Sequence, residues 1–369
     1  MRATAAACRL RLLVIALALS ADLCAPGDGG VLLAAEPLPA SLLESTAIAI
    51  ATESDPEASA RKIRRELNRL EKKAKRRIRA AEDLQERREL FDRFFFTQAG
   101  FRGSTAVDPE RPEGGGSETG SRLFLHDVLE TRSGTCVGLA QVYLILAERL
   151  RLPVVGSATP AHLFVRWVDG GVRINTELLE QGAEYPHADY RTRYRIHEAE
   201  PSNPVFLRDL TTDEVAARIY NNRGVLRSQV EHLDAAASDY ARAIDLDARF
   251  PAPYYNSGLD QLNSGQLNEA LSSFDAALAL HPNDAWALNN RGLAHLKLGQ
   301  LEQAEEDFRS AVAIEPGLTA ARTNLSLVSS RINRGNRVSE GQTVTEGTGS
   351  SSETTPARDP AGVTAGPRP

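Results

Sequence analysis

A cysteine, a histidine and an acidic residue occur in an order and context that could support nucleophilic chemistry. Cys136 follows Ser133-Gly134-Thr135 at the expected start of a helix. Helix N-termini carry unpaired N–H groups and the positive end of the helix dipole, which favour thiolate over thiol. A thiolate attacks carbonyl carbon, and the same N–H groups could stabilise the oxyanion, so acyl transfer is the indicated chemistry. The alternative is that Cys136 packs as a small buried hydrophobe.

The histidine is expected on a β-hairpin. His162 opens a predicted strand over residues 162–168, and a second predicted strand covers residues 172–177, with a Gly-containing turn between them. If the turn is a two-residue loop at Asp169-Gly170, His162 lies directly opposite Glu177. Residues paired in this way have Cβ atoms about 4.5–5.5 Å apart, so the imidazole and the carboxylate could meet.

A different loop would change the pairing without separating the two side chains. A loop shifted by one residue places Glu177 opposite Phe164, which leaves His162 as a diagonal neighbour on the same face. In either register the acid could fix the histidine tautomer and stabilise the imidazolium. Asn175 is on the same face and is the reserve candidate. The alternative is a surface His–Glu pair without a catalytic role.

The elements that must position these residues are visible in the hydrophobic pattern. A helix from about Cys136 to Leu150 is apolar on nearly all sides and is therefore expected to be buried. The longest helical signal covers residues 57–96 and carries one apolar stripe. Residues 103–121 are rich in Gly, Ser, Glu and Pro and predict a flexible loop.

Basic residues are concentrated in the long helical signal. Between Arg61 and Arg93 there are 14 basic and 7 acidic residues. Such an excess could bind nucleic acid or phospholipid. Because there is no aromatic interleaving and no recognition motif, the favoured interpretation is a solvated helix face with ion pairs such as Glu71–Lys75 and Glu89–Arg93. We therefore expect no nucleic-acid partner.

A repeat of 34 residues dominates the chain after residue 211. Small residues and one aromatic position recur at this interval, namely Gly224, Gly258 and Gly292, then Ala236, Ala270 and Ala304, then Ala243, Ala277 and Ala311, and finally Tyr240, Phe274 and Phe308. This pattern matches tetratricopeptide repeats, in which small residues lie where paired helices touch. We expect three repeats, a capping helix over residues 319–333, and a peptide or protein partner bound by the repeats.

The two ends of the chain have compositions unlike the middle. The first 35 residues resemble an export signal, with Arg2, Arg9 and Arg11 before the apolar run Leu12–Leu19. Small-residue cleavage sites follow Ser20, Ala21 and Ala35; an uncleaved anchor is the alternative. No later segment is expected to span a membrane, so we predict a periplasmic or extracellular protein.

The set of cysteines in the mature protein depends on where that signal is cleaved. Cleavage after Ala35 would leave Cys136 as the one thiol, whereas earlier cleavage would leave Cys24 free to pair with it. From Gly335 to the end, the chain has almost no large apolar residue and is expected to be disordered. The predicted organisation is a signal (1–35), a first domain (36–210), repeats with a capping helix (211–334) and a tail (335–369).

Overall composition excludes several classes of protein. The chain has 369 residues, 42% hydrophobic and 25% charged residues and a net charge of −6. Its length suggests roughly two domains, and its mild acidity gives no general attraction to nucleic acid. The seven histidines show no metal-ligand spacing. We therefore expect neither a metal nor a cofactor.

Several segments resemble one known superfamily. The run Leu123–Leu139 looks like the core of the transglutaminase-like superfamily, most similar to the bacterial branch whose module ends in tetratricopeptide repeats. Pro160–Arg166 resembles the histidine strand of that branch, Asn175-Thr176-Glu177 stands where the superfamily has its acid, and Phe206–Thr211 resembles the join to the repeats. The usual acid is aspartate, and some members of this branch lack the cysteine.

The resemblance implies a fold class and a set of roles. The implied fold is an α+β papain/transglutaminase-like core, with a helical N-terminal part and a small antiparallel sheet, followed by an all-α repeat solenoid. The implied roles are nucleophile for Cys136, base for His162 and orienting acid for Glu177. We predict an exported thiol-dependent acyl-transfer enzyme, either an amide or peptide hydrolase or a transamidase. The alternative is a non-catalytic protein-interaction scaffold, and the sequence leaves the oligomeric state open.

Overall fold

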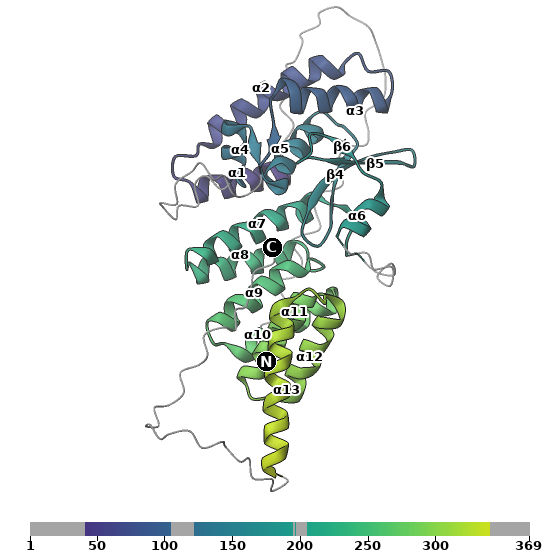
Figure 1. The fold of residues 1–369 in the computed structure, drawn as a ribbon. Helices are drawn as coiled ribbons and strands as arrows, with labels where there is room; N and C mark the ends of the chain where they lie inside the picture. Colours follow the sequence, from purple (N-terminus) through teal and green to yellow (C-terminus); the bar gives the residue numbers. More distant parts are fainter. Residues whose placement is uncertain (1–40, 105–121, 195, 197–204, 340–369) are drawn as a thin grey trace, which may run out of the picture. The chain divides into compact units, whose positions relative to one another are not determined.

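The computed structural model describes residues 41–104, 122–194, 196 and 205–339. The predicted export signal, with Cys8 and Cys24, lies outside these residues, as do residues 105–121 of the Gly-rich segment and residues 340–369 of the predicted tail. In the described part of the chain, helices come first, a five-stranded sheet follows, and helices alone continue from α7 onward (Figure 1).

The N-terminal helices differ from the single long helix expected over residues 57–96. The structure has α1 (Leu42–Ser54), α2 (Ala60–Ile78), α3 (Leu84–Asp92) and the π-helix η1 (Arg93–Gln98). The expectation of one continuous helix is therefore wrong. The chain turns after α2, where the Ala81 N–H donates to the Ile78 carbonyl, and Asp83 starts α3 by accepting a hydrogen bond from the Glu86 N–H. An N-cap aspartate favours a new helix start over continuation.

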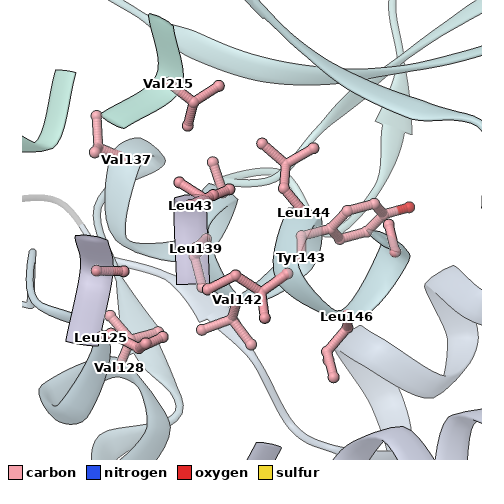
Figure 2. Close-up of a cluster of buried hydrophobic side chains, with 14 of the residues drawn as sticks. Leu43, Leu125, Val128, Val137, Leu139, Val142, Tyr143, Leu144, Leu146 and Val215 are labelled. Atoms are coloured by element: carbon pink, nitrogen blue, oxygen red, sulfur yellow. The ribbon is translucent and has the colours of Figure 1, made fainter. Parts of the chain in front are cut away.

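Helix α5 (Cys136–Arg149) lies at the centre of the hydrophobic core. All its residues from Val137 to Ala147 are buried, as the apolar pattern predicts. Leu43 of α1, Val128 of α4 (Leu125–Thr131) and Val215 of α7 belong to the same cluster (Figure 2). Because α5 is enclosed on several sides, its first turn, which carries Cys136, has a fixed position.

A small antiparallel sheet packs on this helical part. Its strand order is β6-β5-β4-β3-β7, and all four pairings are antiparallel. The strands are β3 (Val154–Ala158), β4 (Leu163–Asp169), β5 (Val172–Glu177), β6 (Ala183–Glu184) and β7 (Asp209–Leu210). The short helix α6 (His187–Arg193) follows β6, and a separate two-stranded parallel pair joins β1 (Arg102–Gly103) to β2 (Ser133–Gly134) just before α5.

The hairpin between β4 and β5 uses the shifted register. Asp169 pairs with Val172, so the loop is Gly170-Gly171 and the expected loop at Asp169-Gly170 is wrong. Both glycines have positive φ angles, 52° and 91°. Two consecutive positive φ values suit the tight hairpin turns that match strand twist, and glycine adopts them without steric penalty.

The 34-residue repeat corresponds to pairs of helices. The helices are α7 (Thr212–Gln229), α8 (Leu233–Leu246), α9 (Pro251–Asn263), α10 (Leu267–Leu280), α11 (Ala285–Lys297), α12 (Leu301–Ile314) and α13 (Thr319–Ser339). A Cβ added at Gly258 would lie 2.9 Å from the Phe274 ring, and one at Gly292 would lie 2.8 Å from the Phe308 ring. The recurring glycine therefore makes room for the recurring aromatic ring. The predicted fold class is confirmed, although the last helix runs five residues beyond residue 334.

The first repeat helix also belongs to the core of the preceding domain. Leu210, Val215 and Ile219 are buried in the cluster that contains α5. Asp247, after α8, accepts hydrogen bonds from Arg208 and Arg218. Within the described ranges, no helix is both long and apolar enough to cross a membrane.

Candidate active site

The first turn of α5 positions Cys136. Thr135 is the N-cap residue, and its side chain accepts a hydrogen bond of 3.1 Å from the Gly138 N–H. The Thr135 N–H donates to the Arg122 carbonyl at 3.1 Å. Position 138 requires glycine, because a Cβ there would lie 2.4 Å from the Arg122 carbonyl oxygen. Cys136 is a free cysteine, and the residue as a whole is intermediate between buried and exposed.

His162 and Glu177 are in direct contact. His162 Nε2 lies 2.6 Å from Glu177 Oε2, and their side chains are 7% and 3% exposed. The other carboxylate oxygen accepts from the Leu179 N–H at 3.1 Å, and the Tyr190 hydroxyl donates to Oε2 at 3.5 Å. These contacts fix the carboxylate, which in turn fixes the imidazole and leaves Nδ1 as the ring nitrogen for a further partner.

Cys136 lies beside this imidazole, close enough for each group to shift the pKa of the other, so the structure brings together the three residues that the sequence singled out. Burial, the largest influence, raises the pKa of Cys136. The hydrogen bond and charge of His162, with backbone hydrogen bonds from Leu163 and Val137, outweigh it and lower that pKa.

The pKa of His162 shifts in the opposite direction. Burial, again the largest single influence, lowers the pKa of His162, but hydrogen bonds and charges from Cys136 and Glu177 prevail and raise it to about 9. A lowered thiol pKa beside a raised imidazole pKa favours the thiolate–imidazolium ion pair. Cys136 also occupies the first helical position, where the helix itself supplies no acceptor for the N–H. That N–H could donate to a developing oxyanion.

Two tyrosines that sequence reasoning missed enclose the histidine side of the site. The Tyr194 ring stacks on His162 with ring centroids 5.7 Å apart and an interplanar angle of 3°. Tyr190, on α6, stacks on Phe164 with centroids 4.0 Å apart. The spacing of four residues between Tyr190 and Tyr194 places both on one side of a helical turn, which was the available signal. Burial is the main reason that the pKa of Tyr194 rises to about 12.

Asn175, the reserve candidate for the residue that orients the imidazole, has a different set of partners. It pairs with Arg166 across the hairpin and accepts a hydrogen bond of 2.7 Å from Arg166 Nε. Its own Nδ2 donates to the Tyr185 carbonyl at 3.0 Å. The structure therefore does not place it on the imidazole. The buried Arg166, which the sequence did not single out, also donates to the Leu207 carbonyl and to Asp209.

A cavity of about 420 Å³ lies beside this arginine. It is lined by Arg166, Arg173, Asn175, Tyr185, Pro186, His187 and Leu207. The Arg166–Asn175 pair lies two residues along the hairpin from Phe164 and Glu177, and on the same face of the sheet. The cavity is therefore on the side of the triad that carries Glu177 and away from the thiol. Burial and the charge of Arg166 lower the pKa of His187. No group of three His, Cys, Asp or Glu side chains in the described ranges could hold a metal ion.

Comparisons with known proteins agree with this architecture. The family model described as the transglutaminase-like superfamily matches residues 61–221, and models described as tetratricopeptide repeat match residues 217–250 and 255–318. No curated relative matches the chain.

The solved structures that resemble the chain include tetratricopeptide-repeat (TPR) domains. The first TPR domain of human RPAP3 is 23% identical, with 33% of this chain and 95% of that chain covered and a TM-score of 0.32. The Arabidopsis OM64 TPR domain is 22% identical, with 31% and 96% covered and a TM-score of 0.31. The Sgt2 TPR domain from Aspergillus fumigatus is 17% identical, with 39% and 91% covered and a TM-score of 0.32. The family models thus identify a transglutaminase-like core at residues 61–221, followed by tetratricopeptide repeats.

Proposed function

We propose that this protein is an exported thiol-dependent acyl-transfer enzyme that acts on amide or peptide bonds. The observation that carries the proposal is the position of His162, which interacts with Cys136 at a helix N-terminus and lies 2.6 Å from the buried Glu177. A thiol, an imidazole and an acid in this order activate a nucleophile and orient its base.

The geometry supports a two-step reaction. In the first step the Cys136 thiolate attacks the substrate carbonyl carbon, and the carbonyl electrons move to the oxygen, near the Cys136 N–H. As the oxyanion collapses, the C–N bond breaks and the His162 imidazolium gives its proton to the leaving amine, which leaves a thioester on Cys136. In the second step neutral His162 takes a proton from water, the resulting hydroxide attacks the thioester, and the C–S bond breaks, which releases the carboxylic acid and restores the Cys136 thiolate beside the His162 imidazolium. An amine in place of water would give transamidation.

The remaining parts of the proposal concern location and partner. Export is supported by the basic residues before the eight-residue apolar run Leu12–Leu19. Tetratricopeptide repeats stack helix pairs into extended concave surfaces. We assign to this surface the binding of a peptide or protein partner.

The test is the alkylation rate of Cys136 by iodoacetamide as a function of pH. Peptide mapping by mass spectrometry would separate Cys136 from Cys8 and Cys24. We expect alkylation to rise at a pH well below the ~8.5 of a free cysteine. A His162→Ala variant should lose most of this shift, because the hydrogen bond and charge of His162 are the largest effects that lower the thiol pKa. An ordinary titration in both proteins would contradict the proposal and leave the non-catalytic scaffold as the function.

A further inference from the structure

Helix α2 presents a basic face that the proposed enzyme does not use. Eleven Lys and Arg side chains on this helix and its C-cap are exposed: Arg69, which pairs with Glu66, and ten others, namely Arg61, Lys62, Arg64, Arg65, Lys72, Lys73, Lys75, Arg76, Arg77 and Arg79. The apolar residues Ile63, Leu67, Leu70 and Ala74 are buried against the core. The helix therefore has one face in the core and an outward face made almost entirely of basic side chains.

Within the described ranges, one ion pair, Arg69–Glu66, neutralises a basic side chain of this face. Among the described residues none of the ten side chains makes an ion pair, and the expected pairs Glu71–Lys75 and Glu89–Arg93 are absent. Glu71 instead pairs with Arg149 of α5. The other acid of α2, Glu66, pairs with Arg69 and with Arg132. Both acidic side chains of α2 are thus directed to other partners, and in the part of the chain that the structure describes no acidic side chain pairs with the ten basic ones.

The shape of this face limits what can bind it. Nineteen helical residues at 1.5 Å each make a straight face about 28 Å long. At 100° per residue, the ten basic positions spread over about 220° of the helix circumference. The helix carries no aromatic ring on which a base could stack, and Asn68 is its one uncharged amide. It therefore suits a broad anionic surface better than a ligand with a defined outline.

We propose that the basic face of α2 binds the surface of a bilayer that contains anionic phospholipid. Clustered Lys and Arg side chains are attracted to such surfaces, and their contributions accumulate. Because the apolar side of α2 is occupied by the core, the helix cannot insert, so binding is peripheral and reversible by salt. The choice of phospholipid over nucleic acid rests on the proposed export, since an exported protein meets lipid headgroups.

The test is flotation of the full chain with vesicles of phosphatidylcholine and phosphatidylglycerol (7:3). Vesicles of phosphatidylcholine alone correct for any binding by the apolar run Leu12–Leu19. We expect strong flotation with the anionic vesicles at 50 mM salt and release at 500 mM. The triple variant Arg65→Gln, Lys72→Gln, Arg76→Gln removes charges from the centre of the face and should lower the partition coefficient roughly 100-fold.

A matched variant carries the same charge change on the repeats. Lys297→Gln, Arg309→Gln, Arg322→Gln alters three exposed basic residues there and should leave flotation unchanged. Equal losses in both triple variants, or no preference for anionic vesicles, would overturn the proposal. Displacement from the vesicles by equimolar duplex DNA would also overturn it in favour of nucleic acid. Cys136 alkylation in both triple variants should match that of the unchanged protein, so this test can fail without affecting the proposed enzyme.

Discussion

Replacing Glu177 by Gln tests whether the buried acid activates the thiol. Glutamine has the same size and can still accept from the Leu179 N–H, so the backbone contact at 3.1 Å can survive. What the variant loses is the negative charge 2.6 Å from His162 Nε2. The substitution therefore separates the electrostatic contribution of Glu177 from its role in packing.

The expected magnitude follows from the difference between charged and neutral hydrogen bonds. A hydrogen bond to a charged group contributes about 1.5–3 kcal/mol and a neutral one about 0.5–1.5 kcal/mol, a difference of roughly 1–1.5 kcal/mol. This difference corresponds to about one pKa unit. The pKa of His162, now raised to about 9, should fall accordingly, and the ion pair with Cys136 should become up to roughly 10-fold less populated.

The assay is again the alkylation rate of Cys136, here at pH 6.5. We expect Glu177→Gln to slow alkylation by up to roughly 10-fold, with a larger effect at pH 6.5 than at pH 9, where thiolate forms without assistance. The matched control is Glu148→Gln, the same chemical change at an exposed position near the other end of α5. Equal rates in Glu177→Gln and the unchanged protein would refute the idea that the acid supports the ion pair.

Three substitutions test other parts of the structure. Burial is the main cause that raises the pKa of Asp92 to about 7, so the folded protein keeps a proton that the unfolded chain releases above pH ~4. The free energy of unfolding should therefore fall between pH 4 and 7 by up to about 4 kcal/mol relative to Asp92→Asn, measured by urea denaturation. Gly138→Ala should destabilise by about 1–3 kcal/mol because its Cβ meets the Arg122 carbonyl oxygen, whereas Gly317→Ala, with open space around it, should not. Phe274→Ala should lower the unfolding free energy by about 3–5 kcal/mol, because a fully buried ring leaves a cavity.

The meeting of His162 and Glu177 could be predicted although the hairpin register could not. The sequence contains Asp169-Gly170-Gly171, which allows two loop positions, and the structure uses the second. Moving the loop by one residue shifts the sum of paired residue numbers by two, and this keeps each side chain on its original face. The face on which each side chain lies is therefore predicted correctly even when the exact pairing is wrong.

The surroundings of the triad were less predictable because they depend on tertiary contacts. Tyr194 lies 17 residues beyond Glu177 in the sequence and reaches His162 because α6 folds back over β5. The break between α2 and α3 depends on Asp83 acting as a cap, a role that competes with the continuing apolar stripe. By contrast, the repeats were visible because each period encodes a local contact, such as Gly258 against the Phe274 ring.

The burial of the triad bears on the choice between an enzyme and a scaffold. Burying a charged pair is expensive, and apolar residues of similar volume often stabilise a fold at least as well. His162 and Glu177 are nevertheless 7% and 3% exposed, and Cys136 lies beside the imidazole. A scaffold has no need for a buried imidazole with a hydrogen-bonded acid on one side and a thiol on the other. A reactive thiol needs each of these features, which is why the alkylation of Cys136 is the measurement that separates the two functions.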